Sequence, residues 1–213
     1  MEREDRVGRF DLQDRIAGLK EAFLAAKKLS PTKLAARIRS IGFHCQKCGE
    51  CCRGEDNSVV VFPNEIRQLI VATGLEWLEV VGPPNEGEWD KAGCFHTLEW
   101  RLKKEGESCR FYQNGRCSVY PDRPILCRTY PFYLDSCELM CSECRGLGGK
   151  MESDEADKMA EQLIMRHLFE IQEAIALLEI YRDFERGGAR KGGGCIVHDS
   201  EGEHWIAPEK LMR

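Results

Sequence analysis

Four cysteines fall within eight residues of this chain, in the run Cys45-Gln46-Lys47-Cys48-Gly49-Glu50-Cys51-Cys52. Gaps of two residues allow successive sulfurs to turn back toward one centre, as metal-binding loops require. The adjacent thiols of Cys51 and Cys52 are expected to project apart, so the run predicts more than one metal ion or one polynuclear cluster. Gly49 is expected to allow the tight loop, because glycine accepts backbone angles that other residues resist. The run predicts a metal site without naming the metal.

Cysteine is frequent in the chain as a whole, with 12 among 213 residues. The charged start Met1–Arg6 lacks the apolar core of a secretory signal, and no apolar stretch approaches the roughly 20 residues that span a bilayer. These features predict a cytoplasmic protein with no membrane partner. Because cytosolic thiols stay reduced, the cysteines are expected to bind metal. A disulfide framework is the alternative for a secreted chain.

The chain is acidic overall but basic around its later cysteines. A formal net charge of −5 gives no general reason to expect nucleic acid as a partner. Between Arg101 and Pro131, however, seven basic residues stand against three acidic ones. Cysteines become anionic thiolates when they bind metal, and offsetting that charge explains the basic excess. Arg53, Arg110 and Arg128 directly adjoin cysteines.

Hydrophobic periodicity and turn residues predict several helices and short strands. Helices are expected over residues 10–29, 31–40, 63–72 and 153–186, and strands over 59–62 and 95–103. Hairpins are expected over 109–120, around Asn114-Gly115, and over 195–206, with Cys127 on a short loop or single turn between them. The predicted fold class is α+β, with a small cysteine-rich metal-binding core of short strands and hairpins. N-terminal helices and one long C-terminal helix flank this core.

One globular unit is expected, made of four consecutive segments. These are N-terminal helices (1–40), a cysteine-cluster metal-binding core (41–150), a long helix with a glycine-rich linker (151–190), and a C-terminal hairpin and tail (191–213). The long helix carries a heptad-like stripe, which predicts a helix docked on the core. The stripe consists of Ala160, Ile164, His167, Ile171, Ala174, Leu178 and Tyr181. Pairing of two chains through residues 154–186 is the alternative, so monomer and dimer both stay open.

Four further cysteines follow the first run at ordered positions. Cys109 and Cys117 are expected on opposing arms of the 109–120 hairpin, which would present two thiolates to one metal. Cys127 lies in a segment punctuated by prolines, and Cys144 precedes a cluster of glycines. Together with the opening run these positions give eight candidate metal ligands: Cys45, Cys48, Cys51, Cys52, Cys109, Cys117, Cys127 and Cys144.

This pattern resembles the zinc- or iron-chelating cysteine-cluster proteins of the CxxCxxCC, YkgJ type. The resemblance rests on Phe43-x-Cys45-x2-Cys48-Gly49-x-Cys51-Cys52-Arg53, on Cys109-x7-Cys117-x2-Tyr120 with Arg123-Pro124, and on Cys127-Arg128-x-Tyr130-Pro131-Phe132 with Cys144 beside Gly146. It spans residues 43–149 and implies metal chelation through the eight cysteines. Related segments occur in flagellin lysine N-methylases, so the resemblance also offers methyl transfer by analogy.

The chain departs from that family in two respects. Arg145 follows the last cysteine, where the family commonly has proline. Four cysteines are extra to the pattern. Cys137-x3-Cys141-x2-Cys144 offers an alternative ligand or a second site, whereas Cys94 and Cys195 are expected to be small buried hydrophobic residues.

Thiolate ligands suit both Zn²⁺ and iron–sulfur clusters. A CxxCxxC run with a remote fourth cysteine is typical of [4Fe–4S] ligation and favours an iron–sulfur cluster, while paired ligands on a hairpin are typical of structural zinc. Three functions follow: an iron–sulfur protein that supports redox or methyl-transfer chemistry with a redox or protein partner, a structural-zinc module that binds a partner, and a metal chelation or delivery protein. The sequence favours the first and identifies neither catalytic residues nor an enzyme class.

Histidines form a weaker set of candidates. His198 and His204 are placed to share one face of the C-terminal hairpin as a nitrogen-ligated metal site, although exposed polar hairpins commonly show this pattern. His44 and His96 lie near the cysteine blocks in sequence, which offers mixed Cys/His ligation as a minor alternative. His167, on the helix stripe, is expected to be an interior or interfacial residue.

Overall fold

The computed structural model describes residues 2–54 and 57–211, with side chains from Leu12 onward. The chain divides into two compact units, each built from two stretches of sequence. The first unit contains the chain up to Lys47 together with Ile125–Glu179, and the second contains Cys48–Pro124 together with the chain from Ile180 onward. These bounds differ from the four consecutive segments predicted above, and the single globular unit stays a prediction.

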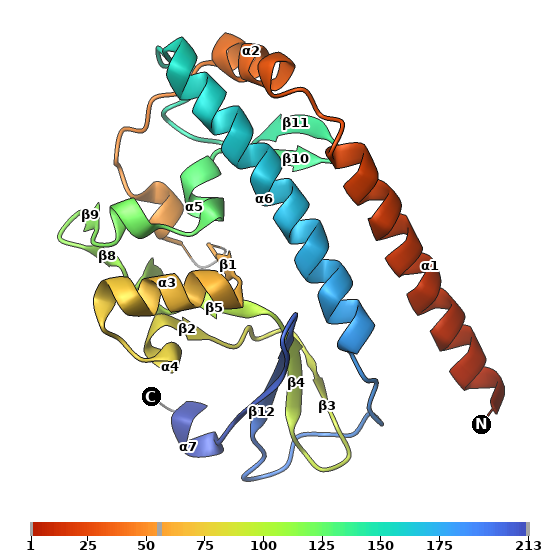
Figure 1. Cartoon of the computed structure of the whole chain (residues 1–213). Coiled ribbons are helices and arrows are strands. Elements are labelled where there is room, and N and C mark those ends of the chain that lie inside the picture. Colours follow the sequence, from red (N-terminus) through yellow and green to blue (C-terminus); the bar gives the residue numbers. More distant parts are fainter. Residues whose placement is uncertain (1, 55–56, 212–213) are drawn as a thin grey trace. The chain divides into compact units, whose positions relative to one another are not determined.

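The first unit is mainly helical. Its helices are α1 (Glu2–Ala26), α2 (Pro31–Ile41), the short α5 (Ile125–Thr129) and α6 (Ser153–Ile180), which is the long blue-green helix in Figure 1. Ser30 caps α2, because its hydroxyl accepts a hydrogen bond from the backbone N–H of Lys33 and Pro31 needs no such partner. The predicted N-terminal helices and the long C-terminal helix are confirmed, with α6 ending six residues before the predicted end at 186.

A short hairpin completes the first unit. Its strands are β10 (Phe132–Asp135) and β11 (Glu138–Cys141), and it packs with α2 and α6 around one core. That core consists of Leu34, Ala35, Ile38, Phe132, Leu134, Leu139, Ala156, Ala160 and Leu163. On α6 the predicted stripe is buried at Ala160 and Ile171, while its other members within the helix are half-buried. The buried face follows the 3.6-residue turn of the helix and drifts away from a strict heptad.

The second unit contains two small sheets. In the first, β5 (Trp100–Leu102) lies between β1 (Val60–Val61) and β2 (Val81–Gly82), and all three strands are antiparallel. The second sheet has the order β13 (Gly202–Ile206), β12 (Cys195–Asp199), β4 (Phe95–Leu98) and β3 (Glu88–Trp89). Here β12 runs parallel to β4, and Figure 1 shows the two strands side by side. Glu99, with φ +60°, separates β4 from β5, so the predicted 95–103 strand divides between the two sheets.

Short helices and hairpins fill the remainder of the second unit. The helical elements are η1 (Glu50–Cys52), α3 (Pro63–Thr73), α4 (Trp77–Val80), η2 (Tyr120–Asp122) and α7 (Pro208–Leu211). The hairpins pair β6 (Lys104–Glu105) with β7 (Ser108–Cys109), and β8 (Tyr112–Gln113) with β9 (Arg116–Cys117). The predicted turn at Asn114-Gly115 is confirmed, because both residues have positive φ.

Helices combined with several small sheets confirm the predicted α+β class. The largest fully buried side chain is that of Trp100, whose indole N–H donates to the carboxylate of Asp199 at 2.8 Å. Within residues 2–54 and 57–211, no helix has both the length and the apolar character required to cross a membrane.

Candidate metal centre

The cysteine run in the second unit turns at a left-handed glycine. Gly49 has φ +75°, and a Cβ at this position would lie 2.2 Å from the ring of Tyr112. The tight loop predicted at Gly49 is therefore confirmed, and the close aromatic ring is a second reason why only glycine fits. The turn that follows is η1, which carries Cys51 and Cys52.

Arg53 and Tyr112 hold this loop through its backbone. The guanidinium of Arg53 donates to the carbonyls of Cys48 (3.1 Å) and Gly49 (3.3 Å) and lies 5.5 Å from the centroid of the Tyr112 ring. The hydroxyl of Tyr112 donates to the carbonyl of Cys48 at 3.4 Å. Polar and cation–π contacts thus fix the loop that presents the thiols.

The thiols of Cys51 and Cys52 lie together, with their Sγ atoms 3.9 Å apart in a shared hydrogen bond. The expectation that they project apart is wrong, because successive side chains of a 3-10 turn are separated by about 120° instead of the 180° of a strand. The hydrogen bond from Cys52 lowers the pKa of Cys51 to about 7. The same bond, burial and the charges of Cys51, Cys109 and Cys117 raise the pKa of Cys52. Cys52 is therefore the donor and Cys51 the acceptor when one thiolate forms.

Cys109 and Cys117 come from two successive hairpins. Cys109 ends β7 and pairs with Lys104, whereas Cys117 ends β9 and pairs with Tyr112. The predicted 109–120 hairpin is therefore shorter than expected, and Cys109 does not lie on its opposing arm. The reason is the turn at Gly106, whose φ of +60° closes a separate β6–β7 hairpin that includes Cys109.

Both of these thiols interact electrostatically with η1. Burial raises the pKa of Cys109 and of Cys117, while backbone N–H groups of Phe111 and Tyr112 at Cys109, and of Val119 at Cys117, act in the opposite direction. A negative charge at Cys51 raises the pKa of both. We call these four residues (Cys51, Cys52, Cys109 and Cys117) the thiol cluster.

A positive charge at the thiol cluster comes from Arg123. In addition to the larger effects of the Cys52 hydrogen bond on Cys51 and of burial on Cys117, its charge lowers the pKa of both thiols. Arg110, which the sequence suggested for this role, pairs instead with Glu79 (3.5 Å) and Glu105 (3.9 Å). The Arg123-Pro124 motif was noticed in the sequence, but nothing in its spacing indicated this electrostatic role.

In the first unit, the segments around Cys45 and Cys144 lie side by side. Phe43 and Leu147 form an antiparallel bridge, and the N–H of His44 donates to the carbonyl of Gly146 at 2.9 Å. The Gln46 side chain donates to the carbonyl of Arg145, 99 residues away in sequence, at 2.9 Å. A Cβ on Gly146 would lie 2.4 Å from the carbonyl oxygen of His44, so this pairing requires glycine. The structure thus brings the first and last predicted ligand segments of this unit together.

The other cysteines occupy varied positions. Cys127 lies on α5, the single turn predicted for it, and the thiol of Cys48 donates to Glu50 at 3.8 Å. Cys195 is buried, as expected, while Cys94 is half-buried. Cys137 has φ +69° in the β10–β11 turn, and Cys141 is exposed at the end of β11.

The cysteine side chains of the thiol cluster are neighbours, but they do not form a closed coordination sphere. Among the residues that the structure describes, no group of three or more His, Cys, Asp or Glu side chains is already arranged to hold a metal ion. The members of the thiol cluster would have to converge around an ion.

His198 and His204 face opposite sides of the β12–β13 hairpin. His204 is opposite Val197 in the register and pairs with Asp199 at 2.9 Å, whereas His198 is opposite Glu203 and pairs with His96 at 2.8 Å. The metal site predicted for one face of this hairpin is therefore wrong, because side chains alternate between the faces of a strand. His96 likewise pairs with His198 and Asp90, not with a cysteine.

The cysteines of the thiol cluster thus lie on short turns and hairpins that have positive φ at Gly49, Gly106 and Asn114-Gly115. Residues 44–145 match the family described as "CxxCxxCC: Putative zinc- or iron-chelating domain". The matched segment includes all eight predicted ligands. The resemblance seen in the sequence is confirmed, and the family supports metal binding as the general function.

Among curated proteins, the chain is similar to an uncharacterized protein of Methanocaldococcus jannaschii. The two are 27% identical over 150 residues, which is 64% of this chain and 75% of that protein. No solved structure matches the chain.

Proposed function

We propose that the second unit chelates one thiophilic metal ion, with zinc preferred, through Cys51, Cys52, Cys109 and Cys117. The observation that carries this proposal is the 3.9 Å separation of the Cys51 and Cys52 sulfurs. Four sulfurs at the usual Zn–S distance of about 2.3 Å stand about 3.8 Å apart on a tetrahedron. The two adjacent thiols therefore already have the spacing of two ligands on one ion.

The donor set fits such an ion. All four residues are thiols, Arg123 offsets part of their negative charge, and backbone N–H groups point at Cys109 and Cys117. Hydrogen-bond donors that surround the ligands orient thiolates and stabilise their anionic form. A Zn²⁺ ion would supply charge neutralisation and a link between η1 and two hairpins.

The exposure of the thiol cluster to solvent favours metal chelation or delivery over a closed structural zinc site. Cys51 is exposed, and the other three members of the thiol cluster are half-buried. Thiols that solvent can reach allow metal to enter and leave, which chelation or delivery requires.

An iron–sulfur cluster is the second candidate, supported by the CxxCxxC spacing of Cys45, Cys48 and Cys51. In a [4Fe–4S] cluster each thiolate binds a different iron, which holds the sulfurs farther apart than two ligands of one ion. If the protein binds an iron–sulfur cluster, its function would be to support redox or methyl-transfer chemistry. The roles of Cys45, Cys48, Cys127 and Cys144 as ligands remain proposals that rest on the sequence.

Anaerobic purification followed by metal and acid-labile sulfide analysis tests the proposal. We expect a colourless protein with zinc, and we expect Cys51→Ser and Cys117→Ser each to lose about one zinc ion per chain. Cys141→Ser, at an exposed cysteine outside the thiol cluster, is the matched control and should keep its zinc. Iron with equimolar sulfide and a visible absorption band would establish the cluster instead. Full metal retention in both cluster variants would refute the assignment of these ligands.

A further inference from the structure

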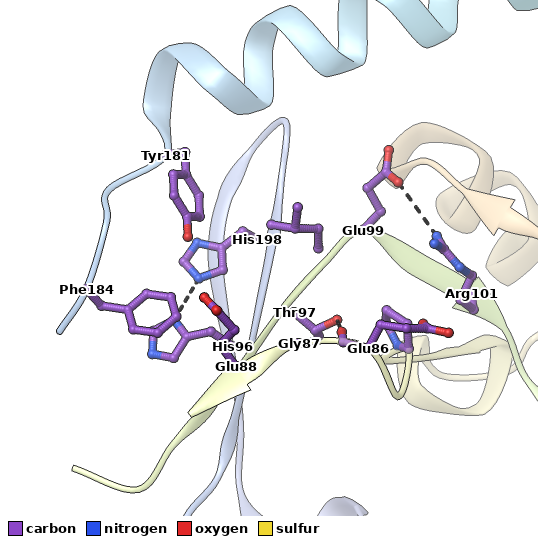
Figure 2. Close-up of a pocket in the computed structure, with 12 residues that line it drawn as sticks. Glu86, Gly87, Glu88, His96, Thr97, Glu99, Arg101, Tyr181, Phe184 and His198 are labelled. Carbon is purple, nitrogen blue, oxygen red and sulfur yellow. Dashed lines mark hydrogen bonds and ion pairs between the residues drawn. The ribbon is translucent and has the colours of Figure 1, made fainter. Parts of the chain in front are cut away.

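The second unit contains a cavity of about 480 Å³ that none of the eight candidate cysteine ligands lines. Its walls come from the 84–88 loop, the strands β4, β5 and β12, and the segment that follows α6. Figure 2 shows His96, His198, Tyr181 and Phe184 gathered at one end of it, with Glu99 and Arg101 toward the other. The volume lies within the roughly 300–1,000 Å³ of small-molecule sites.

Two buried histidines form the polar end of this cavity. His96 and His198 are 8% and 2% exposed, and Nδ1 of His96 lies 2.8 Å from Nε2 of His198. The other nitrogen of His96, Nε2, lies 3.3 Å from the carboxylate of Asp90. Asp90 in turn accepts the backbone N–H of Cys94 at 2.7 Å. The three side chains form one hydrogen-bonded chain.

Asp90 orients the ring of His96 in this hydrogen-bonded chain. The backbone bond from Cys94 lowers the pKa of Asp90, which keeps its carboxylate charged and able only to accept. Nε2 of His96 therefore donates to Asp90, and Nδ1 of His96 faces Nε2 of His198. In the tautomer in which Nε2 of His198 donates to His96, Nδ1 of His198 is a lone-pair acceptor, and this is the tautomer that the proposal below uses. Burial lowers the pKa of His198 and favours this neutral form.

This last nitrogen lacks a hydrogen-bond partner within the described part of the chain. The charged group recorded beside Nδ1 of His198 is the carboxylate of Glu203, at 3.9 Å, which is beyond hydrogen-bond reach. Because His198 lines the cavity, a donor on a bound molecule could form this hydrogen bond. A cationic donor would also be attracted by Glu203.

The walls favour an apolar group and a positive charge. Phe184 stacks on His96 with ring centroids 3.7 Å apart, and Tyr181 lies 5.0 Å from the ring of His198. Three glutamates line the cavity against one arginine, namely Glu86, Glu88 and Glu99 against Arg101. Arg101 pairs with Glu99 at 3.7 Å and Arg186 pairs with Glu88 at 2.9 Å, which leaves the carboxylate of Glu86 outside these two pairs. Aromatic faces close to a carboxylate are typical of sites for organic cations.

We propose that this cavity binds a small organic amine in its ammonium form, with the ammonium donating to Nδ1 of His198 beside Glu203 and an attached apolar group lying against Tyr181 and Phe184. This inference is independent of the metal centre, because it uses none of the eight candidate cysteine ligands.

Benzylamine and benzoate test the proposal, since they share a ring and size but carry opposite charge. Each is titrated into full-length, metal-loaded protein labelled with ¹⁵N-histidine, and the ring nitrogens are followed by NMR. We expect His198 to be protonated at Nε2 before addition, and we expect benzylamine, but not benzoate, to shift Nδ1 of His198. Equal shifts with both probes, or none with benzylamine, would overturn the proposal.

Two exposed carboxylates provide variants that should fold normally. Glu203→Gln and Glu86→Gln should each weaken benzylamine binding by about twofold to fivefold, as expected for partly exposed ion pairs. Glu209→Gln, an exposed glutamate on α7 away from the cavity lining, is the matched control and should bind like the parent protein. Unchanged binding in Glu203→Gln would contradict the placement of the ammonium beside His198.

Discussion

The guanidinium carbon of Arg123 lies 3.6 Å from the centroid of the Tyr120 ring. Stacking holds the charge of Arg123 in place through its planar face, and from there it lowers the pKa of Cys51 and Cys117 in the thiol cluster. Metal ligation requires thiolates, so Arg123 stabilises the metal-bound form more than the protonated, metal-free form.

Replacing Arg123 with Gln should therefore weaken zinc binding by a factor on the order of ten, because one charge near the thiolates is removed. Competition with a chromophoric chelator measures the change. Arg116→Gln, at an exposed arginine of the β8–β9 hairpin, is the control and should have little effect. Equal losses of zinc affinity in both variants would mean that the net charge of the protein matters and that the position of Arg123 does not.

Zinc affinity should rise steeply with pH. Burial raises the pKa of Cys109 and Cys117, the Cys51 hydrogen bond raises that of Cys52, and the pKa of Cys51 is about 7. Below pH 7 all four thiols hold protons that the metal must displace, so the logarithm of the zinc association constant should increase by about four per pH unit. Above pH 7, where Cys51 is already a thiolate, it should increase by about three per pH unit. Zinc titrations at several pH values measure the slope. A slope near one would exclude a four-thiol site.

Gly49→Ala should destabilise the cysteine loop. The alanine would occupy a left-handed conformation, which costs about 1–2 kcal/mol, and its Cβ would also overlap the Tyr112 ring. Gly115→Ala has φ +77° but no atom within 4 Å of its Cβ, so it reports the backbone cost alone. Urea unfolding should show a larger loss for Gly49→Ala, and zinc retention should fall with it. Matching losses would mean that the Tyr112 contact is unimportant.

His204 should stabilise the second unit most at mildly acidic pH. Its hydrogen bond to Asp199 raises the pKa of His204, so this contribution is complete below the ordinary value of 6.5 and is lost as pH rises through the raised value. Burial raises the pKa of Asp199, but the hydrogen bond from His204 is among the interactions that together outweigh this effect, and the pKa is lowered. The stability that Asp199 contributes is therefore lost as pH falls below about 3.8. His204→Gln should thus cost about 1–2 kcal/mol at pH 6 and less at pH 9. Thermal unfolding at both pH values, with His44→Gln as the exposed control, checks this. A loss independent of pH would contradict the ion pair.

Arg166 should be important for the first unit. Its guanidinium donates to the hydroxyl of the buried Thr129 (3.0 Å) and to the carbonyl of Phe132 (3.4 Å), and it pairs with Glu170 at 2.6 Å. Arg166→Met should lower the free energy of unfolding by about 2–3 kcal/mol. Lys158→Met removes an exposed pair on the same helix and should change it by less than about 0.5 kcal/mol. Similar values for the two variants would refute a specific role for Arg166.

Local signals in the sequence predicted most elements well. Ser30-Pro31 began α2, Gly74 ended α3, and Asn114-Gly115 formed the β8–β9 turn, because each of these residues restricts its own backbone. The predictions failed where the bounds of a strand depend on pairing with a neighbouring strand. Glu99 divides one predicted strand between two sheets, and Gly106 places Cys109 in a separate hairpin.

The candidate sites show the same division. Spacing identified the cysteines of the thiol cluster and the need for glycine at position 49. It could not show that Arg123, rather than Arg110, acts on the thiols, since Arg110 is occupied by Glu79 and Glu105. The contact between His96 and His198 joins residues 102 apart in sequence and arises from the parallel pairing of β4 with β12.

The CxxCxxCC run by itself predicted a metal site with thiol ligands and a loop that must turn at glycine. Those properties depend on residue type and short-range geometry, which a sequence states directly. Tertiary structure alone decided that Cys51 and Cys52 lie together beside Cys109 and Cys117, and that a histidine pair borders a cavity elsewhere in the same unit. These arrangements depend on which distant strands and turns meet, and the packing of the folded chain sets that.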